Sequence, residues 1–301
     1  MKLTVGKSQR YTTIQEALTE AKNQSQTEDI LIAIEPGCYH ERLVVDIDNI
    51  TIAGLGDNAF DTVIEYDLSA FEIMDDGTKR GTFRTQTVFV HGNNITFKNL
   101  TIANTAGDGS KAGQCLAINA EGVDITYENC RLLGHQDTIF TGPLPYKEKE
   151  LGGFRGPMQY EPRCYNRQFF NNCYIEGTVD YIFGGAECYF NNCTIHSLFM
   201  DRNRMGYVTA ASTPEGQATG FVFDNCRFEG DAMTGSVYLG RPWRNFARVT
   251  VKNSYLGEVI HQAHWHDWNK PDAHDTICYT ESNNYGPGAS YENYADFAHL
   301  E

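Results

Sequence analysis

A short phrase, in which two apolar-rich stretches flank an asparagine, occurs six times along this chain of 301 residues. The asparagines are 30, 43, 20, 33 and 28 residues apart, at Asn99, Asn129, Asn172, Asn192, Asn225 and Asn253. Runs of four to six residues rich in β-branched and aromatic side chains favour strands over helices. A repeated two-strand unit with insertions of variable length predicts an all-β fold, a right-handed parallel β-helix with one unit per coil. A β-sandwich is the alternative, but sandwiches rarely repeat one phrase in register.

Cysteine follows four of the six asparagines, at Cys130, Cys173, Cys193 and Cys226. Equivalent residues of successive coils stack on one another, so the cysteines and the asparagines are each expected to form an internal column. Cys173 and Cys193 have no insertion between them and should lie close enough for a disulfide, which a cytoplasmic protein would keep reduced. No CxxC pair is present, so the usual spacing of zinc ligands is missing.

Both ends of the chain differ from the repeats. Residues 11–24 carry a helical stripe of apolar side chains at Ile14, Ala17, Leu18 and Ala21. Thr13 and Glu16 fit a capping box at its start. Because a solenoid has open ends, this helix is predicted to cap the first one. Residues 49–56 resemble an early coil, and residues 291–301 are expected to cover the other end.

Composition and charge limit the possible functions of the chain. Residues 1–301 are expected to form one domain and to act as a monomer. The net charge of −15 excludes nucleic acid as a partner, and no run of 18 apolar residues predicts a membrane span. The first residues show no signal-peptide pattern, which predicts a cytoplasmic protein, or a secreted one if a leader has been removed. His261, His264 and His266 superficially resemble a metal cluster, but a loop packed on the solenoid is the preferred interpretation.

Two aspartates occupy the same position within the repeated phrase. Asp137 lies eight residues after Asn129, and Asp180 lies eight residues after Asn172. Neighbouring strands are about 4.7–4.9 Å apart, so the two carboxylates are expected side by side. At about 5 Å and an effective dielectric near 20 they repel by roughly 3 kcal/mol, or about two pKa units. The pair should therefore hold one proton near neutrality and act as one acid and one anion.

An acid beside an anion serves two reaction classes. A retaining glycosidase and an esterase with a carboxylate nucleophile both use such a pair. A solvated aspartate ladder and a calcium site are the non-catalytic alternatives. Gln136 precedes Asp137, and Gln114 lies one coil earlier. Two amide donors suit a developing oxyanion better than the cationic transition state of a glycosidase, so they favour the esterase.

Segments along nearly the whole chain, from about residue 11 to residue 288, resemble the signatures of pectin methylesterases. They are residues 36–45, 113–122, 134–140, 177–187 and 238–246. The resemblance implies a right-handed parallel β-helix that hydrolyses methyl esters of galacturonate in pectin or its oligomers, without a metal or organic cofactor. The stretch 141–164 is similar to long loops of bacterial members, so a bacterial-type member is expected, with this stretch at the rim of the cleft.

The resemblance also implies roles for individual residues. Asp180 is the expected nucleophile and Asp137 the general acid and then base. Gln114 and Gln136 are expected to stabilise the oxyanion, while Arg241 holds Asp180 ionised.

Four further residues are expected to contact substrate. Trp243 and Tyr181 would pack against sugar rings, while Thr87 and Phe140 would line the subsites.

Other functions on the same fold make different demands on the sequence. A polygalacturonase is expected to show NTD, GHG and RIK segments, which are absent, and a lyase would need an acidic calcium site. A non-catalytic carbohydrate-binding solenoid would not need the two aspartates, two glutamines and arginine together. The net charge of −15 also predicts repulsion of the anionic product, a preference for highly methylated substrate, and a benefit from salt on partly de-esterified pectin.

Overall fold

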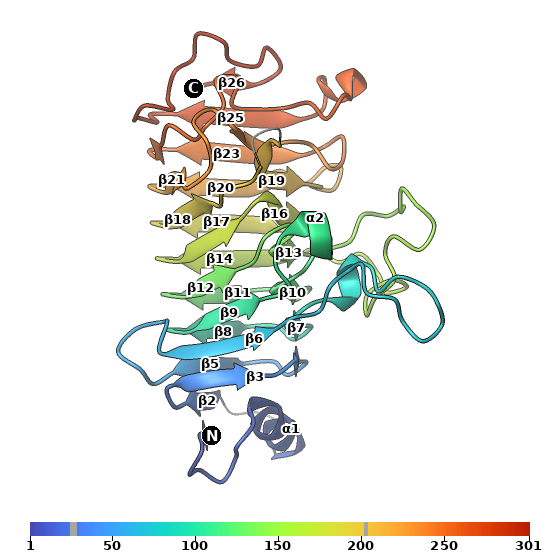
Figure 1. Ribbon diagram of the computed structural model, residues 1–301, viewed down its shortest axis with the longest axis vertical. Coiled ribbons are helices and arrows are strands. Elements are labelled where there is room, and N and C mark those ends of the chain that lie inside the picture. Colours follow the sequence, from blue (N-terminus) through green and yellow to red (C-terminus); the bar gives the residue numbers. More distant parts are fainter. Residues whose placement is uncertain (25–28, 202–203) are drawn as a thin grey trace.

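The computed structural model describes residues 1–24, 29–201 and 204–301 and is a right-handed parallel β-helix, as predicted. Its coils stack along one long axis from the N-terminus to the C-terminus (Figure 1). Three parallel sheets of 11, 8 and 7 strands, here sheets A, B and C, run along this axis. Each complete coil contributes one strand to each sheet, so every residue of a coil lies next to its equivalents in the coils above and below.

Sheet A begins each repeat. Its strands are β1 Lys2–Val5, β2 Ile30–Ile34, β5 Ile50–Gly54, β8 Ile95–Lys98, β11 Ile125–Glu128, β14 Arg167–Asn171, β17 Glu187–Asn191, β20 Phe221–Asp224, β23 Arg248–Lys252, β25 Cys278–Ser282 and β26 His299–Leu300. The expected early coil at residues 49–56 is confirmed by β5, which pairs with β2 and β8.

Sheets B and C complete each coil. Sheet B consists of β3 Gly37–His40, β6 Thr62–Tyr66, β9 Thr101–Asn104, β12 Arg131–Leu133, β15 Tyr174–Gly177, β18 Thr194–Ser197, β21 Arg227–Gly230 and β24 Tyr255–Leu256. Sheet C consists of β4 Leu43–Val45, β7 Val88–Val90, β10 Ile118–Ala120, β13 Ile139–Thr141, β16 Val179–Gly184, β19 Gly206–Ala211 and β22 Val237–Gly240. Short helical turns, α2 Gly109–Ala112, η1 Thr82–Arg84 and η2 Pro271–Ala273, lie in the connections.

The repeated asparagine occupies the bend between sheets A and B. All six repeat asparagines have φ between 51° and 55°. This left-handed conformation strains most side chains, but asparagine tolerates it. Some of the asparagines also bond along the column, as from Asn225 to Asn192. Asparagine therefore recurs at this position because it tolerates the left-handed backbone and because its side chain can bond to the next coil.

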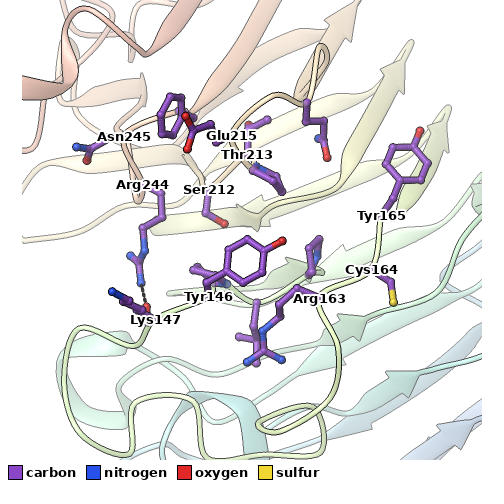
Figure 2. A pocket seen from close by; sticks show the side chains of 16 residues that line it. Tyr146, Lys147, Arg163, Cys164, Tyr165, Ser212, Thr213, Glu215, Arg244 and Asn245 are labelled. Carbon is purple, nitrogen blue, oxygen red and sulfur yellow. Dashed lines mark hydrogen bonds between the residues drawn. The ribbon is translucent and has the colours of Figure 1, made fainter.

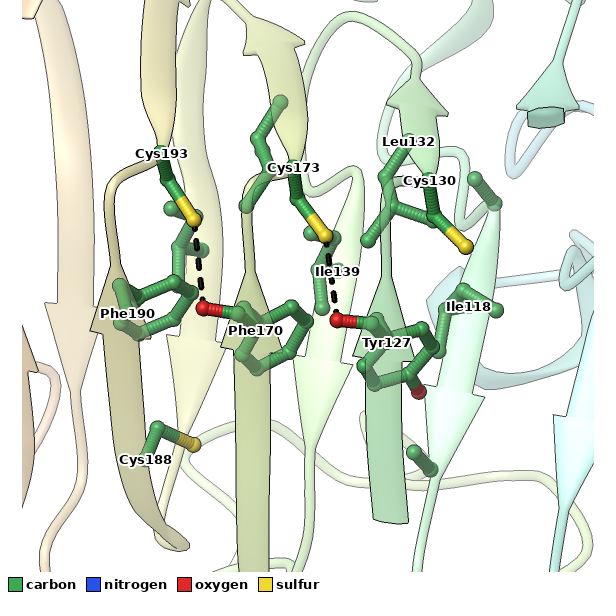
Figure 3. Packing of buried hydrophobic residues seen from close by; sticks show 14 of the residues in the cluster. Ile118, Tyr127, Cys130, Leu132, Ile139, Phe170, Cys173, Cys188, Phe190 and Cys193 are labelled. Carbon is green, nitrogen blue, oxygen red and sulfur yellow. Dashed lines mark hydrogen bonds between the residues drawn. The ribbon is translucent and has the colours of Figure 1, made fainter. Parts of the chain in front are cut away.

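Aromatic rings and thiols stack inside the solenoid as two columns (Figure 3). Consecutive rings in the aromatic column are nearly parallel with centroids 4.3–5.3 Å apart, at Phe97, Tyr127, Phe170, Phe190 and Phe223. The predicted cysteine column is present, and three of its four thiols donate to carbonyl groups of the preceding coil, as from Cys193 to Phe170 at 3.3 Å. All nine cysteines are free, so Cys173 and Cys193 are not joined by a disulfide.

The predicted helix caps the first coil. Helix α1 spans Ile14–Gln24 and buries the four apolar residues of the stripe. It begins three residues later than the stripe because Thr13 is its cap. The amide of Glu16 donates to the Thr13 hydroxyl, and the Thr13 amide donates to the Glu16 carboxylate, both at 3.3 Å. At the other end of the solenoid, strand β26 and the partly buried Tyr294 and Phe297 cover the core, as expected for residues 291–301.

The histidine-rich loop packs against the last coils. His264 is buried, with Nδ1 2.8 Å from the Glu281 carboxylate and Nε2 3.1 Å from the carbonyl oxygen of Ser290. The Trp265 indole donates to the same carboxylate at 2.9 Å. In the part of the chain that the structure describes, no group of three or more histidine, cysteine or acidic side chains could hold a metal ion. Within those same residues, no helix has the length and apolar character needed to cross a membrane.

One buried carboxyl group, next to sheet C, is expected to make the free energy of unfolding depend on pH. Glu121 follows β10, and burial raises its pKa to about 8 from an ordinary value of 4.5. The folded protein then binds this proton more tightly than the unfolded chain, so the free energy of unfolding falls as pH rises from about 4.5 to about 8. Glu121→Gln is expected to stabilise the protein by roughly 1–4 kcal/mol near pH 8 and to lose this advantage near pH 4.

Urea unfolding of parent and variant at both pH values measures this effect. Glu128→Gln, which removes a carboxylate ion-paired with Lys98 on the solvent side of sheet A, is the control. If Glu121→Gln changed the free energy of unfolding equally at both pH values, titration of this carboxyl group would not be the cause of the pH dependence.

Candidate active site

The two aspartates stand in neighbouring coils, where the repeat places them. Asp137 lies just before β13, and Asp180 is the second residue of β16. The register pairs Ile139 with Ile182, the same offset that relates the two aspartates. The amide of Asp137 also donates to the carbonyl oxygen of Val179 at 2.9 Å.

The backbone at both positions is unusual for a strand. Asp137 has a φ of 62° and Asp180 a φ of 50°, and the pairing of β16 with β19 shifts register between Val179 and Ile182. Left-handed residues and bulges interrupt the alternation of a strand and redirect its side chains, and they recur beside active sites. Here both carboxylates line a surface pocket rather than the solenoid interior.

A pocket of about 330 Å³ over sheet C brings together all five residues with expected catalytic roles and Trp243. Arg241 follows β22 and grips Asp180 with two parallel hydrogen bonds, Nε to Oδ1 at 2.8 Å and Nη2 to Oδ2 at 2.7 Å. The rings of Tyr207 and Trp268 each lie 3.8 Å from the guanidinium carbon of Arg241. This bidentate, stacked arrangement fixes the charge and the direction of the Asp180 carboxylate.

Burial and charge divide the two carboxyl groups into an acid and an anion. Asp137 is 8% exposed and Asp180 is 7% exposed. Burial and, next, the negative charge of Asp180 raise the pKa of Asp137 well above its ordinary value. Burial also raises the pKa of Asp180, but the charge and hydrogen bonds of Arg241 oppose this shift. Arg241 thus favours the negative charge on Asp180, and the shared proton is favoured on Asp137.

Two amide side chains flank the pair. Gln136 immediately precedes Asp137 and bonds to its carboxyl group. Gln114 also lines the pocket. It directly follows Gly113, the residue with a φ of 75° at which helix α2 ends. Gly109 in this helix has no room for a side chain, because a Cβ atom there would lie 2.7 Å from Gln136. Both glutamines thus line the same pocket as the two carboxyl groups.

The structure overturns three of the four expected substrate contacts. Tyr181 is fully buried inside the solenoid, where its hydroxyl lies 2.9 Å from that of Ser197. Phe140 is fully buried beneath Trp243. Thr87 is also buried, and its hydroxyl donates to the carbonyl oxygen of Ala103. Residue type does not show whether a side chain faces inward, as Tyr181 does, or is covered by other rings, as Phe140 is. Of the four residues, only Trp243 lines the pocket.

Several pocket residues were not anticipated from the sequence. Phe83 lies in η1, Phe154 in the long stretch 141–164, and Trp268 in the loop after β24. Phe154 packs edge-on against Trp243 with centroids 6.1 Å apart. Lys149 and Glu150 also line the pocket, which confirms that this stretch rims the cleft. None of these residues stands in the repeated phrase, so register could not locate them.

Two buried carboxyl groups, the arginine that binds one of them and two amides lie together on the outer face of a parallel β-helix, an arrangement that suits a hydrolase. A family model described as Pectinesterase matches residues 3–145 and 160–299. The chain therefore belongs to the pectinesterase family, and it is a carboxylic ester hydrolase that acts on the methyl esters of pectin.

Individual relatives agree with this assignment. Putative pectinesterase 14 of Arabidopsis thaliana is 30% identical over 306 residues, covering 100% of this chain and 81% of the relative. Pectinesterase 31 of the same plant is 30% identical, covering 93% and 80%. The solved pectin methylesterase from carrot has a TM-score of 0.82 at 29% identity, covering 99% of this chain and 88% of its own. These relatives are plant proteins, so the expectation of a bacterial-type member is not supported.

Proposed function

We propose that Asp180 attacks the methyl ester of a galacturonate unit while Asp137 first donates and then accepts a proton. The observation that carries this proposal is the bidentate bond between Arg241 and Asp180 beside the buried Asp137, whose pKa lies well above its ordinary value. All the groups required come from one chain, so a monomer suffices. The pocket lies on the outer face of sheet C, where internal units of a polymer as well as short oligomers can enter.

The first step forms an acyl-enzyme. An oxygen of Asp180 attacks the ester carbonyl carbon, and the carbonyl π electrons move to its oxygen. Gln114 and Gln136 donate hydrogen bonds to this oxyanion. When the carbon–methoxy bond breaks, Asp137 gives its proton to the departing oxygen, and methanol leaves. The product is an anhydride between Asp180 and the substrate carboxyl group.

The second step consumes water. Asp137, now ionised, takes a proton from a water molecule, whose oxygen attacks the substrate acyl carbon of the anhydride. The bond to Asp180 breaks and leaves this residue as a carboxylate, while Asp137 keeps the proton that it took from water. One ester and one water thus become one carboxylic acid, which ionises in solvent, and one methanol.

Release of methanol from methyl-esterified pectin, with an equal amount of new carboxylate, tests the proposed function. Cleavage of the sugar backbone without methanol would instead assign the site to a glycosidase or lyase.

Truncation of one oxyanion donor gives a more specific prediction. Gln114→Ala is expected to lower kcat by about 10²-fold with little change in KM, because the donor acts mainly when negative charge develops. Initial rates on methylated pectin measure this. Gln24→Ala, at the exposed end of helix α1, is the control and should leave kcat unchanged. A normal kcat for Gln114→Ala would reduce this residue to a structural role.

A further inference from the structure

A second groove, of about 1070 Å³, shares Arg244 with the catalytic pocket, and Figure 2 shows the side chains that line it. Its walls are the segments that follow β13, β19 and β22 and the one that precedes β14, at residues 143–147, 212–217, 244–246 and 163–165. The two aspartates lie at the other end of the strands of sheet C. Asp137 precedes β13, and Asp180 is near the start of β16. Strands of three to six residues span about 10–20 Å, so the groove lies across sheet C from the reacting carboxyl groups.

Arg244 links the two sites, because it lines both the groove and the catalytic pocket. Its guanidinium donates to the carbonyl oxygens of Trp243 and Lys147, each at 2.9 Å, and the second of these bonds is drawn in Figure 2. It also lies 4.7 Å from the ring centre of Trp243. One polymer that occupies the catalytic pocket and extends past Arg244 would therefore enter the groove.

The groove is rich in cations that lack an acidic partner. Lys147, Arg163 and Arg244 line it, and none of them has a carboxylate within 4.0 Å among the described residues. Arg163 donates only to backbone carbonyls, such as that of Met158 at 2.7 Å. It interacts electrostatically with Glu121, but that carboxyl group, with a pKa of about 8, carries little charge at neutral pH. Among the lining residues that the structure describes, Glu215 is the one acidic side chain.

Exposed aromatic rings accompany these cations. Tyr146 is 80% exposed and Tyr165 is 48% exposed, on opposite walls of the groove (Figure 2). An exposed tyrosine offers an apolar face that can cover a sugar ring. The hydroxyl of Tyr165 donates to the Glu187 carboxylate at 2.9 Å, which holds this ring in place. Neutral sugars would need only the rings, whereas the unpaired cations add a preference for acidic sugars.

We propose that the groove binds a de-esterified stretch of the polymer whose methyl ester occupies the catalytic pocket. The free carboxylates of galacturonate units contact Lys147, Arg163 and Arg244, and the two tyrosines cover sugar rings. This inference rests on the proposed function and adds a preference for esters that adjoin a hydrolysed stretch. It reverses the expectation from net charge, because the cations that meet the substrate are gathered on one face of an acidic protein.

Part of this groove lies outside the segments that the family model matches. The pectinesterase family model matches up to residue 145 and resumes at residue 160, so Tyr146, Lys147 and Lys149 fall outside the shared pattern. Lys149 lies on the catalytic side of the same stretch, where its charge acts on Asp180. The insertion thus extends the cationic surface from the catalytic pocket into the groove.

Binding of an unesterified oligogalacturonate to the full chain carrying Asp180→Asn tests the proposal without turnover. Adding Tyr146→Ala and Lys147→Glu is expected to weaken binding by about fivefold or more, because aromatic contact is lost and a charge is reversed. Both side chains are exposed and lie outside the catalytic pocket. Lys7→Glu, an exposed charge change near the first strand, makes the same change in net charge as Lys147→Glu and should not weaken binding.

Kinetics supply the second measurement. With Asp180 intact, Tyr146→Ala with Lys147→Glu should lower kcat/KM on low-methyl pectin more than on a short, fully esterified oligomer, and added salt should lower the parent's rate on low-methyl pectin. Equal binding by the altered and unaltered chains, or an equal ratio of the two kcat/KM values, would overturn the proposal. Absence of methanol release by the parent would refute the proposed function, while the binding measurement would still decide whether the groove holds oligogalacturonate.

Discussion

Asp180→Asn is expected to lower methyl-ester hydrolysis by about 10⁴-fold or more while the protein remains folded. An amide has no negative charge with which to attack the ester carbonyl carbon, but it has nearly the size of the carboxylate. Asparagine also accepts the left-handed backbone, with a φ of 50°, at this position. Methanol release from methylated pectin measures the rate, and circular dichroism with thermal unfolding checks the fold.

Asp124→Asn is a closely matched control for this variant. Asp124 also has a left-handed backbone, with a φ of 58°, and its carboxylate also pairs with an arginine, Arg167. It lies outside the catalytic pocket. Near-normal activity of Asp124→Asn would show that loss of an arginine-paired aspartate is not itself inactivating. Retention of more than a few per cent of activity by Asp180→Asn would exclude Asp180 as the nucleophile.

Asp137→Asn is expected to lower kcat by about 10²- to 10⁴-fold and to abolish the alkaline limb of the pH profile. In the parent, activity should fall as pH rises through the elevated pKa of Asp137, because an ionised Asp137 has no proton for the departing methoxide. Activity should also fall at low pH, where Asp180 becomes protonated and loses its nucleophilic form. Asparagine at position 137 cannot lose a proton in this range, so only the acidic limb should remain.

Measurement of kcat/KM against pH for parent and variant distinguishes Asp137 from a second candidate. Burial and the proximity of Lys149 lower the pKa of Lys270 to about 7, and the charge of Lys270 acts on Asp180. An alkaline limb that persists in Asp137→Asn would therefore assign that limb to Lys270. Its loss in Asp137→Asn, together with its persistence in Lys270→Gln, would confirm Asp137 as the acid.

The repeated phrase determined the architecture because each coil bonds to the next through the same backbone positions. Equivalent residues then stack by necessity, and this property places Asp137 beside Asp180 and forms the columns of cysteine, asparagine and aromatic side chains. The capping helix could also be predicted from the sequence, because its cap residues Thr13 and Glu16 and its apolar stripe are local signals. Sequence spacing alone was therefore sufficient for the fold, the register and the catalytic pair.

Only the tertiary structure decided which side chains face the cleft. Left-handed residues and a register shift interrupt the strand alternation around Asp180, so Tyr181 lies inside the solenoid although its neighbour lines the pocket. Phe154 and Trp268 enter the pocket from loops whose paths no repeat constrains.

The distribution of charge was also a tertiary property. The sequence determines a net charge of −15, but this total does not show where on the surface the charges lie. Folding brings Arg244 into one groove with Lys147 and Arg163, which lie in a different connection, although the chain as a whole is acidic. Electrostatic forces on a bound polymer fall off within about 10 Å in salt, so these nearby cations outweigh the distant acidic groups.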